Sequence, residues 1–349
     1  MCAVSTELPQ GPIDSTSALA RHLGLSRWTI SRVLNGHPEV KPATKRRVCE
    51  AMERLGFVPS PVGRALRGGR TGMVGVCFQA LGSPIVARRL AVLQRVLRAA
   101  GLRALFELTD GDPAIELEVV RHFVAMRLDG LVLVGGATAQ NEEAIASMLA
   151  SHRTPAVLVD PVREYTLPSV GVDRGAGMRL ALEHLLGLGH ERFALLGIDE
   201  GTAYGGARWR GLRELAGVRR LSVKRQFVTL AEVEPGGLDF AYGRRLADRF
   251  LGLERRPTAI VALNDQVAVG AMTRLQQAGL DVPTEVSVVG FDNLDVGAHV
   301  NPRLTTVDQR VEELMQGVVA RLMGGVSGGV SILEPRLVKG ESSGPVGGG

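Results

Sequence analysis

A short segment near the N-terminus, residues 27–34, places hydrogen-bonding side chains on one face of a predicted helix. Ile30, Val33 and Leu34 recur at positions i, i+3 and i+4, so the opposite face packs inward. The outward polar face fits the major groove of DNA, whose base edges offer hydrogen-bond donors and acceptors. An ordinary helical hairpin with a solvated charged face is the alternative. The outward-facing side chains are those of Arg27, Trp28, Ser31 and Arg32.

The residues around this segment predict a helix-turn-helix pair followed by a third helix. Ser15 or Thr16 can cap the first helix, and Gly24 can adopt the left-handed conformation that ends it. Ser26 then caps the second helix. Residues 42–56 begin with a proline and end with a glycine, which predicts a third helix between them. Together the three helices can bury one small apolar core.

The net positive charge of the chain is concentrated at this end. Residues 1–70 contain eleven Lys and Arg against five Asp and Glu, whereas the remaining residues contain thirty against thirty-one. The whole-chain excess of +5 therefore lies in the N-terminal fifth, where cationic side chains can neutralise phosphates and release counterions. A solvated basic surface would explain the charge alone, but not its coincidence with a helix-turn-helix pattern.

Composition limits the class of protein. The 349 residues exceed one typical domain, and a hydrophobic content of 45% with only 4% aromatic residues suits α/β cores. Cys2, Cys49 and Cys77 are spaced too irregularly for a metal site or a disulfide framework, which favours a reducing cytoplasm. No segment approaches the roughly 20 apolar residues of a membrane span, so we expect a soluble, unexported protein without a membrane partner.

From Met73 onward, short apolar runs alternate with amphipathic helices. We expect eight strands, the first MVGVCF and the last VSVVGF, and their alternation with helices predicts parallel, doubly wound sheets. Ligands of such sheets bind at the carboxyl ends of the strands. An enzyme is the alternative, but the chain has no complete dinucleotide fingerprint, no GxxxxGK[ST] loop and no metal-ligand spacing. We therefore expect no catalytic residues, no metal and no cofactor.

Residues 15–71 resemble the headpiece and hinge of the lactose- and galactose-repressor family of bacterial transcriptional regulators. The resemblance rests on TISRVLNG, on LGFVP after the third helix and on RAL in the hinge, and it continues through the rest of the chain. It implies an all-α helix-turn-helix headpiece and an α/β periplasmic-binding-protein-like core of two doubly wound parallel-sheet subdomains. It also implies a homodimer or tetramer that represses transcription from a palindromic operator in double-stranded DNA, controlled by a small-molecule effector such as a sugar.

In that family the second helix enters the major groove and a hinge leucine wedges into the minor groove. By position, Arg27, Trp28 and Arg32 would face base edges and Leu66 would be the wedge. The alternatives are that Trp28 packs on the headpiece core and that Leu66 is a linker residue. The side chains expected to hold phosphates and fix the register are Ser26, Thr29, Ser31 and Asn35.

The resemblance, with the composition of the two ends, also sets expected domain boundaries. The expected parts are a disordered N-terminus over 1–13, the headpiece over 14–59, the hinge over 60–71, the core over 72–340 and a disordered tail over 341–349. Within the core, the N-subdomain would comprise about 73–160 and 292–322, and the C-subdomain about 161–291 and 323–340.

Polar side chains at several strand ends would converge on the cleft between the two subdomains. Carboxylates, an amide and a guanidinium suit a hydroxyl-rich ligand, and the residues that supply them match effector-contacting positions of the family. For Asp173 and Asp265, capping a helix N-terminus is an alternative to ligand contact. The candidates for effector binding are Gln79, Ser83, Asp160, Arg208, Asn264 and Asp292.

Several departures from the family pattern leave the effector's identity open. Leu238 stands where several sugar-binding members have a stacking aromatic residue, and Ile85 and Val86 replace a common aromatic pair. Arg174 replaces the usual Asn. Less ring-stacking surface weakens the case for a hexose and leaves a pentose, a nucleoside or another small polar metabolite open. Neither the direction of the response, induction or corepression, nor the operator sequence follows from the residues.

Overall fold

The computed structural model describes residues 13, 15–34, 37–58, 70–135, 140–161, 166–232, 237–324 and 329–347. Asn35, Leu66 and most of the expected hinge over 60–71 lie outside the described residues, as does the expected disordered N-terminus apart from Ile13. The roles assigned to Asn35 and Leu66 therefore stay predictions.

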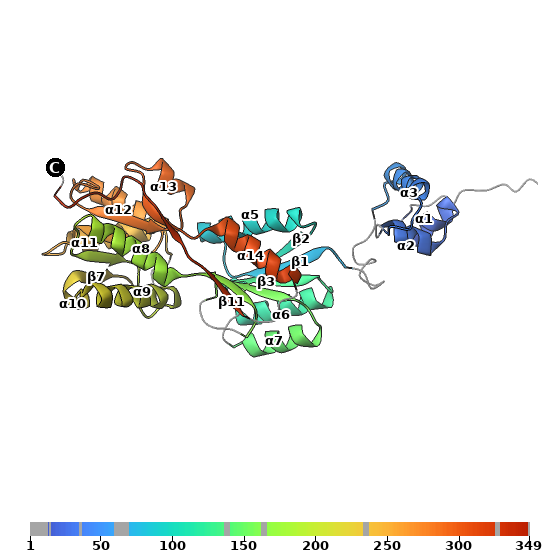
Figure 1. The fold of residues 1–349 in the computed structure, drawn as a ribbon, viewed down its shortest axis with the longest axis horizontal. Helices are drawn as coiled ribbons and strands as arrows, with labels where there is room; N and C mark the ends of the chain where they lie inside the picture. Colours follow the sequence, from blue (N-terminus) through green and yellow to red (C-terminus); the bar gives the residue numbers. More distant parts are fainter. Residues whose placement is uncertain are drawn as a thin grey trace, which may run out of the picture. The chain divides into compact units, whose positions relative to one another are not determined.

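The headpiece consists of three helices around one apolar core. The Ser15 hydroxyl accepts a hydrogen bond from the first turn of the first helix, and Gly24 ends that helix in the left-handed conformation, with φ of 62°. Each helix contributes one fully buried aliphatic side chain, from Leu19, Ile30 and Val48. These local signals, which the sequence carries, hold the second helix in place. The helices, blue in Figure 1, are α1 (Thr16–Leu23), α2 (Arg27–Leu34) and α3 (Pro42–Leu55).

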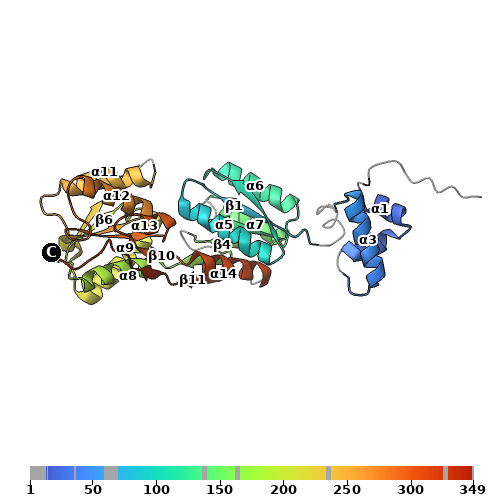
Figure 2. The same ribbon diagram turned by 90° about the horizontal axis from the view of Figure 1, so that it is seen from above.

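The core contains two six-stranded sheets (Figures 1 and 2). The first consists of β1 (Met73–Phe78), β2 (Arg103–Leu108), β3 (Gly130–Val134), β4 (Ala156–Val159), β5 (Ser169–Val172) and β11 (Val330–Leu333). The second consists of β6 (Phe193–Leu196), β7 (Phe227–Leu230), β8 (Ala259–Ala262), β9 (Ser287–Phe291), β10 (Thr305–Asp308) and β12 (Arg336–Val338).

The strand orders are β11-β5-β4-β3-β1-β2 and β12-β10-β9-β8-β6-β7. The pairings from β11 to β1 in the first sheet and from β10 to β7 in the second are parallel, whereas β12 runs antiparallel to β10. The predicted doubly wound parallel sheets are therefore confirmed. Because parallel strands end at one edge of a sheet, the residues that follow them can gather there.

Helices cover both faces of the second sheet, because its strands alternate their side chains between two buried clusters. Ala194 and Leu196 pack with α11 and α12, whereas Phe193 and Leu195 pack with α8 and α9. In the first sheet, α5 and α14 share one buried cluster with the strands. The core helices are α5 (Pro84–Ala99), α6 (Pro113–Ala125), α7 (Glu142–Ser151), α8 (Arg174–Gly187), α9 (Ala203–Arg219), α10 (Val223–Gln226), α11 (Phe240–Leu251), α12 (Asp265–Gln277), α13 (Asp295–His299) and α14 (Val311–Gly324).

The chain crosses between the sheets at different places from those expected. β5 pairs with β4 in the first sheet, so the chain leaves that sheet after Val172 and not after Asp160. β10 belongs to the second sheet and β11 to the first, the reverse of the expected assignment. Among the described residues there are twelve strands, whereas we expected eight. The missed ones are three- or four-residue strands whose sheet is decided by a partner distant in the sequence, and no local pattern carries that information.

The expected disordered tail over 341–349 is wrong for residues 341–347. Ser342 is fully buried, and its hydroxyl donates to the Val288 carbonyl at 2.6 Å and accepts from the Thr305 amide at 2.8 Å. Glu341 forms an ion pair with Arg303 at 3.0 Å. A Gly, Pro and Ser composition indicates weak local preference, but here the backbone and side chains gain partners on the second sheet.

Helices α8 and α9 approach closely because glycines face each other at their contact. A Cβ atom added at Gly211 would fall on the backbone carbonyl of Gly175, well inside van der Waals contact. The same helix carries Gly217, where an added Cβ would meet nothing within 4 Å. The two glycines of α9 therefore differ in what a methyl group would cost.

Gly211→Ala is expected to lower the free energy of unfolding by about 1–3 kcal/mol, because the backbone of Gly175 cannot move aside as a flexible side chain would. Gly217→Ala is the matched control and should raise it by about 0.5 kcal/mol, since alanine favours the helix. Urea unfolding of both variants measures the difference. Equal effects of the two substitutions would contradict close packing of α8 on α9.

Candidate DNA-contacting helix and ligand cleft

The first turn of α2 is held by hydroxyl groups. The Ser26 Oγ accepts a hydrogen bond from the Thr29 amide at 3.0 Å and lies 2.9 Å from the Thr29 hydroxyl. Ser26 therefore caps α2, as the sequence predicts, and orients the helix start. Arg27 and Trp28 follow on the outer surface, and Trp28 is 65% exposed. The alternative that Trp28 packs on the headpiece core is therefore wrong.

Arg32 is held on this surface by an ion pair. Its Nη2 lies 2.6 Å from the Glu39 carboxylate and 3.1 Å from Nε2 of His37. Its guanidinium also lies over the Trp28 ring, 4.1 Å from the centroid. Arg32 must exchange Glu39 for a nucleic-acid acceptor before it can contact a base. Ser31, on the same helix, is half-buried.

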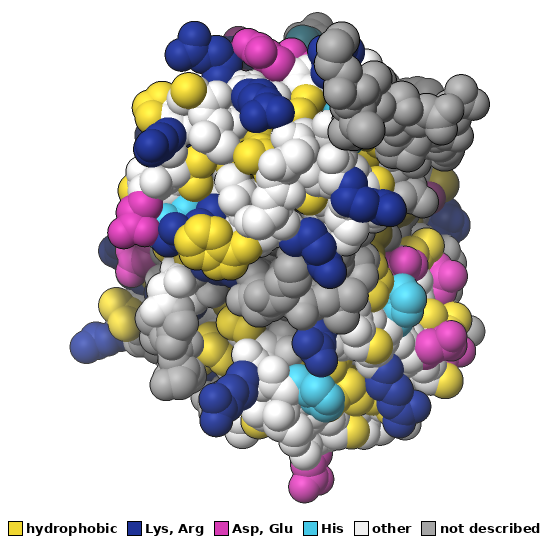
Figure 3. Space-filling view, turned by 90° about the vertical axis from the view of Figure 1, so that its right-hand side faces the viewer, with side chains coloured by type: hydrophobic (Ala, Val, Ile, Leu, Met, Phe, Trp, Pro, Cys, Tyr) yellow, Lys and Arg dark blue, Asp and Glu magenta, His cyan; other side chains and the backbone are white. Residues whose placement is uncertain are grey.

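Cationic side chains dominate the headpiece surface. In Figure 3, in which the headpiece faces the viewer, Lys and Arg spread across the face and Asp and Glu lie mostly toward its edges. Surface cations of this density attract a polyanion, and the attraction falls as salt rises.

In the core, Asp160 is shared by two arginines. It follows β4, is 1% exposed, and accepts from Arg174 Nη1 at 2.6 Å. Arg89, which is 4% exposed on α5, donates to the other carboxylate oxygen at 2.5 Å. Burial alone would raise the pKa of Asp160, but the charges of Arg174 and Arg89 outweigh it and hold the pKa well below its usual range.

This triad joins the two sheets, because Asp160 follows a strand of the first and Arg174 begins a helix that packs on the second. Arg89 extends the connection, since it also donates to Gln309 Oε1. Gln309 in turn donates to Asp292, the residue after β9. Arg88 adds a further link by donating to the Asn293 carbonyl at 2.5 Å. A continuous set of charge-assisted hydrogen bonds thus crosses the cleft.

Asp292 lies at the second sheet's end of this network. Burial raises its pKa to about 6, and Arg208, Arg89 and Gln309 oppose that rise. Its φ of 116° is one that L residues rarely adopt, and such backbone geometry concentrates at ligand sites. Arg208 stacks on the ring of Phe291, 4.3 Å from its centroid, and donates to a backbone carbonyl at 3.0 Å.

The structure therefore brings together three of the predicted effector residues, Asp160, Arg208 and Asp292. Asn264 instead caps α12, accepting from the Val267 amide at 2.8 Å and donating to the Leu238 carbonyl at 2.9 Å. Gln79 follows β1 and is half-buried, and Ser83 precedes α5 without capping it through its side chain.

The two carboxylates for which capping was an alternative differ from each other. Asp173 does cap α8, accepting from the Ala176 amide at 2.8 Å. Asp265 does not cap α12; it is fully buried and accepts from the Thr306 hydroxyl and from the Leu294 amide. Burial, with Asp292 nearby, raises the pKa of Asp265 to about 8, so it is largely protonated at neutral pH.

Sequence reasoning missed Arg89 and Gln309 altogether. One signal was available: Arg89 stands four residues after Ile85 and four before Leu93, both of them buried, so it lies in the apolar stripe of α5. A charged residue in such a stripe must meet a partner in the core. Gln309, which follows β10, carried no comparable signal.

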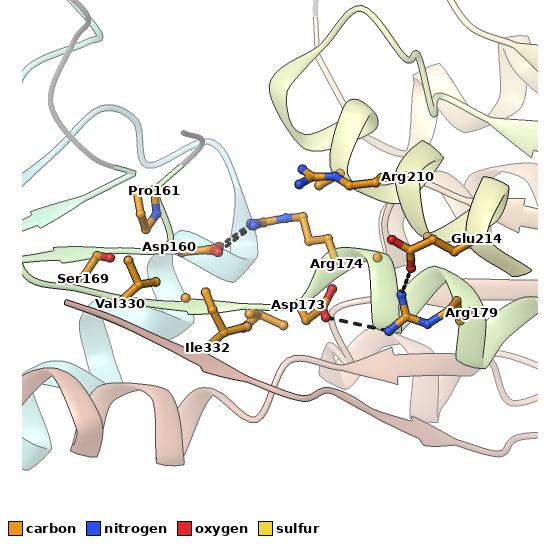
Figure 4. A pocket seen from close by; sticks show the side chains of 15 residues that line it. Asp160, Pro161, Ser169, Asp173, Arg174, Arg179, Arg210, Glu214, Val330 and Ile332 are labelled. Atoms are coloured by element: carbon orange, nitrogen blue, oxygen red, sulfur yellow. Dashed lines mark hydrogen bonds and ion pairs between the residues drawn. The ribbon is translucent and has the colours of Figure 1, made fainter. Parts of the chain in front are cut away.

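A cavity of about 650 Å³ lies beside the triad (Figure 4). Its walls include β5 and β11 on one side and α8 and α9 on the other. The volume suits a small metabolite. The side chains labelled in Figure 4 are those of Asp160, Pro161, Ser169, Asp173, Arg174, Arg179, Arg210, Glu214, Val330 and Ile332.

The two parts of the chain match two family models. Residues 18–60 match bacterial regulatory proteins of the lacI family, and residues 182–343 match a periplasmic binding protein-like domain. The HTH-type transcriptional regulator reg1 of Streptomyces lividans is 31% identical over 325 residues, with 89% of each chain covered. The lactose operon repressor of Escherichia coli K12 is 29% identical over 326 residues, which cover 92% of this chain and 88% of that one.

The similarity extends to the tertiary structure. The crystal structure of the Lac repressor dimer bound to operator and the anti-inducer ONPF superimposes with a TM-score of 0.82 at 25% identity, covering 96% of this chain and 100% of that one. A helix-turn-helix headpiece on a two-sheet, ligand-binding core defines a DNA-binding transcriptional regulator with an effector-binding core. The chain belongs to the lacI family of bacterial regulatory proteins.

No helix among the described residues is both long and apolar enough to cross a membrane.

Asp160→Asn should lower the free energy of unfolding by about 3–5 kcal/mol, because it leaves Arg89 and Arg174 buried without a counter-charge. Acid should weaken the wild type in the same way. The folded pKa of Asp160 is lowered, so its stabilisation is present above the unfolded pKa of about 3.9 and is lost as pH falls through the folded pKa. Urea unfolding between neutral and acidic pH measures both effects.

Glu312→Gln is the control for this change, since it breaks the exposed ion pair with Arg95 and should cost only about 0–1 kcal/mol. The Asn variant should also show a smaller loss of stability in acid than the wild type. An Asp160→Asn protein as stable as Glu312→Gln would contradict the structural role of the triad.

Proposed function

We propose that the protein is a repressor that acts as a homodimer and recognises a palindromic operator through α2 of each headpiece. The observation that carries this proposal is that Arg27 and Trp28 stand exposed on a helix whose other face is locked into the headpiece core. One eight-residue helix reads too few base pairs, and two copies about a two-fold axis double the contacts. That the similar Lac repressor structure is a dimer on its operator supports this arrangement.

Within each half-site, arginines and hydroxyls have different tasks. Arg27, Trp28 and Arg32 contact base edges, the guanidinium groups at guanine and the indole at a thymine methyl or a sugar. Leu66 wedges into the minor groove at the operator centre. The groups that hold phosphates are on Ser26, Thr29, Ser31 and Asn35.

The effector binds in the cleft of the core and changes the affinity for DNA. It can do so only by preferring one arrangement of the two subdomains, and the network across the cleft is what a ligand would rearrange. Asp160, Arg208 and Asp292 are the principal contacts, with Gln79, Ser83 and Asn264 as further candidates at strand ends. The cleft binds without catalysing a reaction, and the protein works in the cytoplasm, where bacterial operator DNA lies.

Arg27→Ala should lose discrimination at one base position of the operator by about 1–3 kcal/mol, because a bidentate contact with one base is removed. Selection of binding sites from random duplexes, followed by affinity measurements on single-base variants, checks this. Arg54→Ala, which removes an exposed arginine of α3, is the control and should leave the preference at every position as it was. Equal loss on all sequences with Arg27→Ala would contradict base recognition by this residue.

Asp292→Ala should abolish the effector response, because it removes a buried acceptor shared with Gln309 and the cleft arginines. A thermal-shift screen against sugars and nucleosides identifies a ligand first, since binding raises the melting temperature. The measured quantity is then the ratio of operator affinities with and without that ligand, which should approach one. A ratio equal to that of the wild type would remove Asp292 from the effector site.

A further inference from the structure

The cavity beside the Asp160 triad contains a cation without a partner. Of its three arginines, Arg174 pairs with Asp160, and Arg179 pairs with Glu214 at 2.6 Å and with Asp173 at 3.8 Å. Arg210, on α9, has neither a hydrogen bond nor an ion pair within the described parts of the chain. Figure 4 shows the Arg210 and Arg174 side chains reaching from their helices toward Asp160 and Pro161.

The charges behind the cavity add to this excess. Arg89 also binds Asp160, so four guanidinium groups stand against three carboxylates in the cavity wall and its first layer. Nε of Arg89 is buried and makes no hydrogen bond with any described residue. A buried donor without an acceptor is costly, and an additional negative charge nearby would offset the excess.

The opposite wall of the cavity is aliphatic. Val330 and Ile332 are 52% and 55% exposed, and they lie on β11, an edge strand of the first sheet. Val172 and Pro161 continue this wall. Small-molecule sites commonly combine an apolar wall with a few charged groups that set the orientation of the ligand.

We propose that the effector is a small organic anion whose carboxylate or phosphate group binds Arg210 and Arg174 while its carbon skeleton packs on Val330 and Ile332. This inference rests on the proposed function, since it names the chemical class of the ligand that the core senses. A neutral polyol would leave the Arg210 charge without a partner and would cover the aliphatic wall with hydroxyl groups.

The same contact supplies a route from ligand to conformation. Arg174 belongs to α8 on the second sheet, and its present partner Asp160 belongs to the first. An anion bound to Arg174 competes with Asp160 and weakens a link between the two subdomains. The ligand therefore has different affinities for the linked and the released arrangement, which is the requirement for regulation.

The test uses the full-length protein with two simple probes, inorganic phosphate and butyrate, each compared with chloride at equal ionic strength. Melting temperature and titration calorimetry should show saturable binding of at least one probe. Arg210→Gln should weaken that binding on the order of tenfold, because it removes a charge-assisted hydrogen bond. Tighter binding of butyrate would indicate a carboxylate ligand, and tighter binding of phosphate a phosphate ester.

Arg219→Gln is the matched control, because it removes an exposed arginine from the last turn of the same helix, outside the cavity. It should bind the probes as the wild type does. Binding no stronger than that of chloride, or equal binding by wild type, Arg210→Gln and Arg219→Gln, would overturn the proposal.

Salt-dependent binding of wild-type protein to duplex DNA, measured on the same preparation, reports separately on the proposed function. If DNA binds and a neutral sugar such as glucose raises the melting temperature while both anions fail, the anionic ligand is wrong and the regulator stands. If DNA does not bind, the proposed function fails, and with it the identification of the anion as an effector.

Discussion

The buried carboxylate of Asp160 is the interaction on which the arrangement of the core depends. Two arginines that are themselves buried converge on it from different elements, one on each side of the cleft. Taking three charges out of water is costly unless each finds its partner. The ends of the two sheets must therefore stay close enough for Arg174 to reach Asp160, and any ligand that changes the local charge changes that requirement.

The headpiece follows a different logic, because its structure depends on short-range contacts. Caps at Ser15 and Ser26 and a small aliphatic core hold α2, and its functional side chains stand free of that core. Arg32 is the exception. Its ion pair with Glu39 must be given up on DNA, so a base that offers Arg32 no acceptor does not compensate for the loss. The pair thus favours selectivity over affinity.

Much of the molecule could be predicted from local patterns. The three headpiece helices, the concentration of positive charge and the parallel sheets follow from caps, composition and apolar runs of the chain. The sheet crossings and the ordered segment after Gly340 could not be predicted, because β5, β10 and Ser342 depend on partners far away in the sequence. Of the effector candidates, Asp160, Arg208 and Asp292 gather in the cleft, whereas Asn264 serves its own helix.

The sequence alone thus determined the class of protein and the helix that faces DNA, because caps and helical periodicity act within a few residues. Only the tertiary structure decided how the cleft is built. Arg89 and Asp160 are 71 positions apart and Arg89 and Gln309 are 220 apart, yet each pair forms a hydrogen bond. Whether an arginine within an apolar stripe meets a carboxylate depends on how sheets and helices pack, and the local sequence does not contain that geometry.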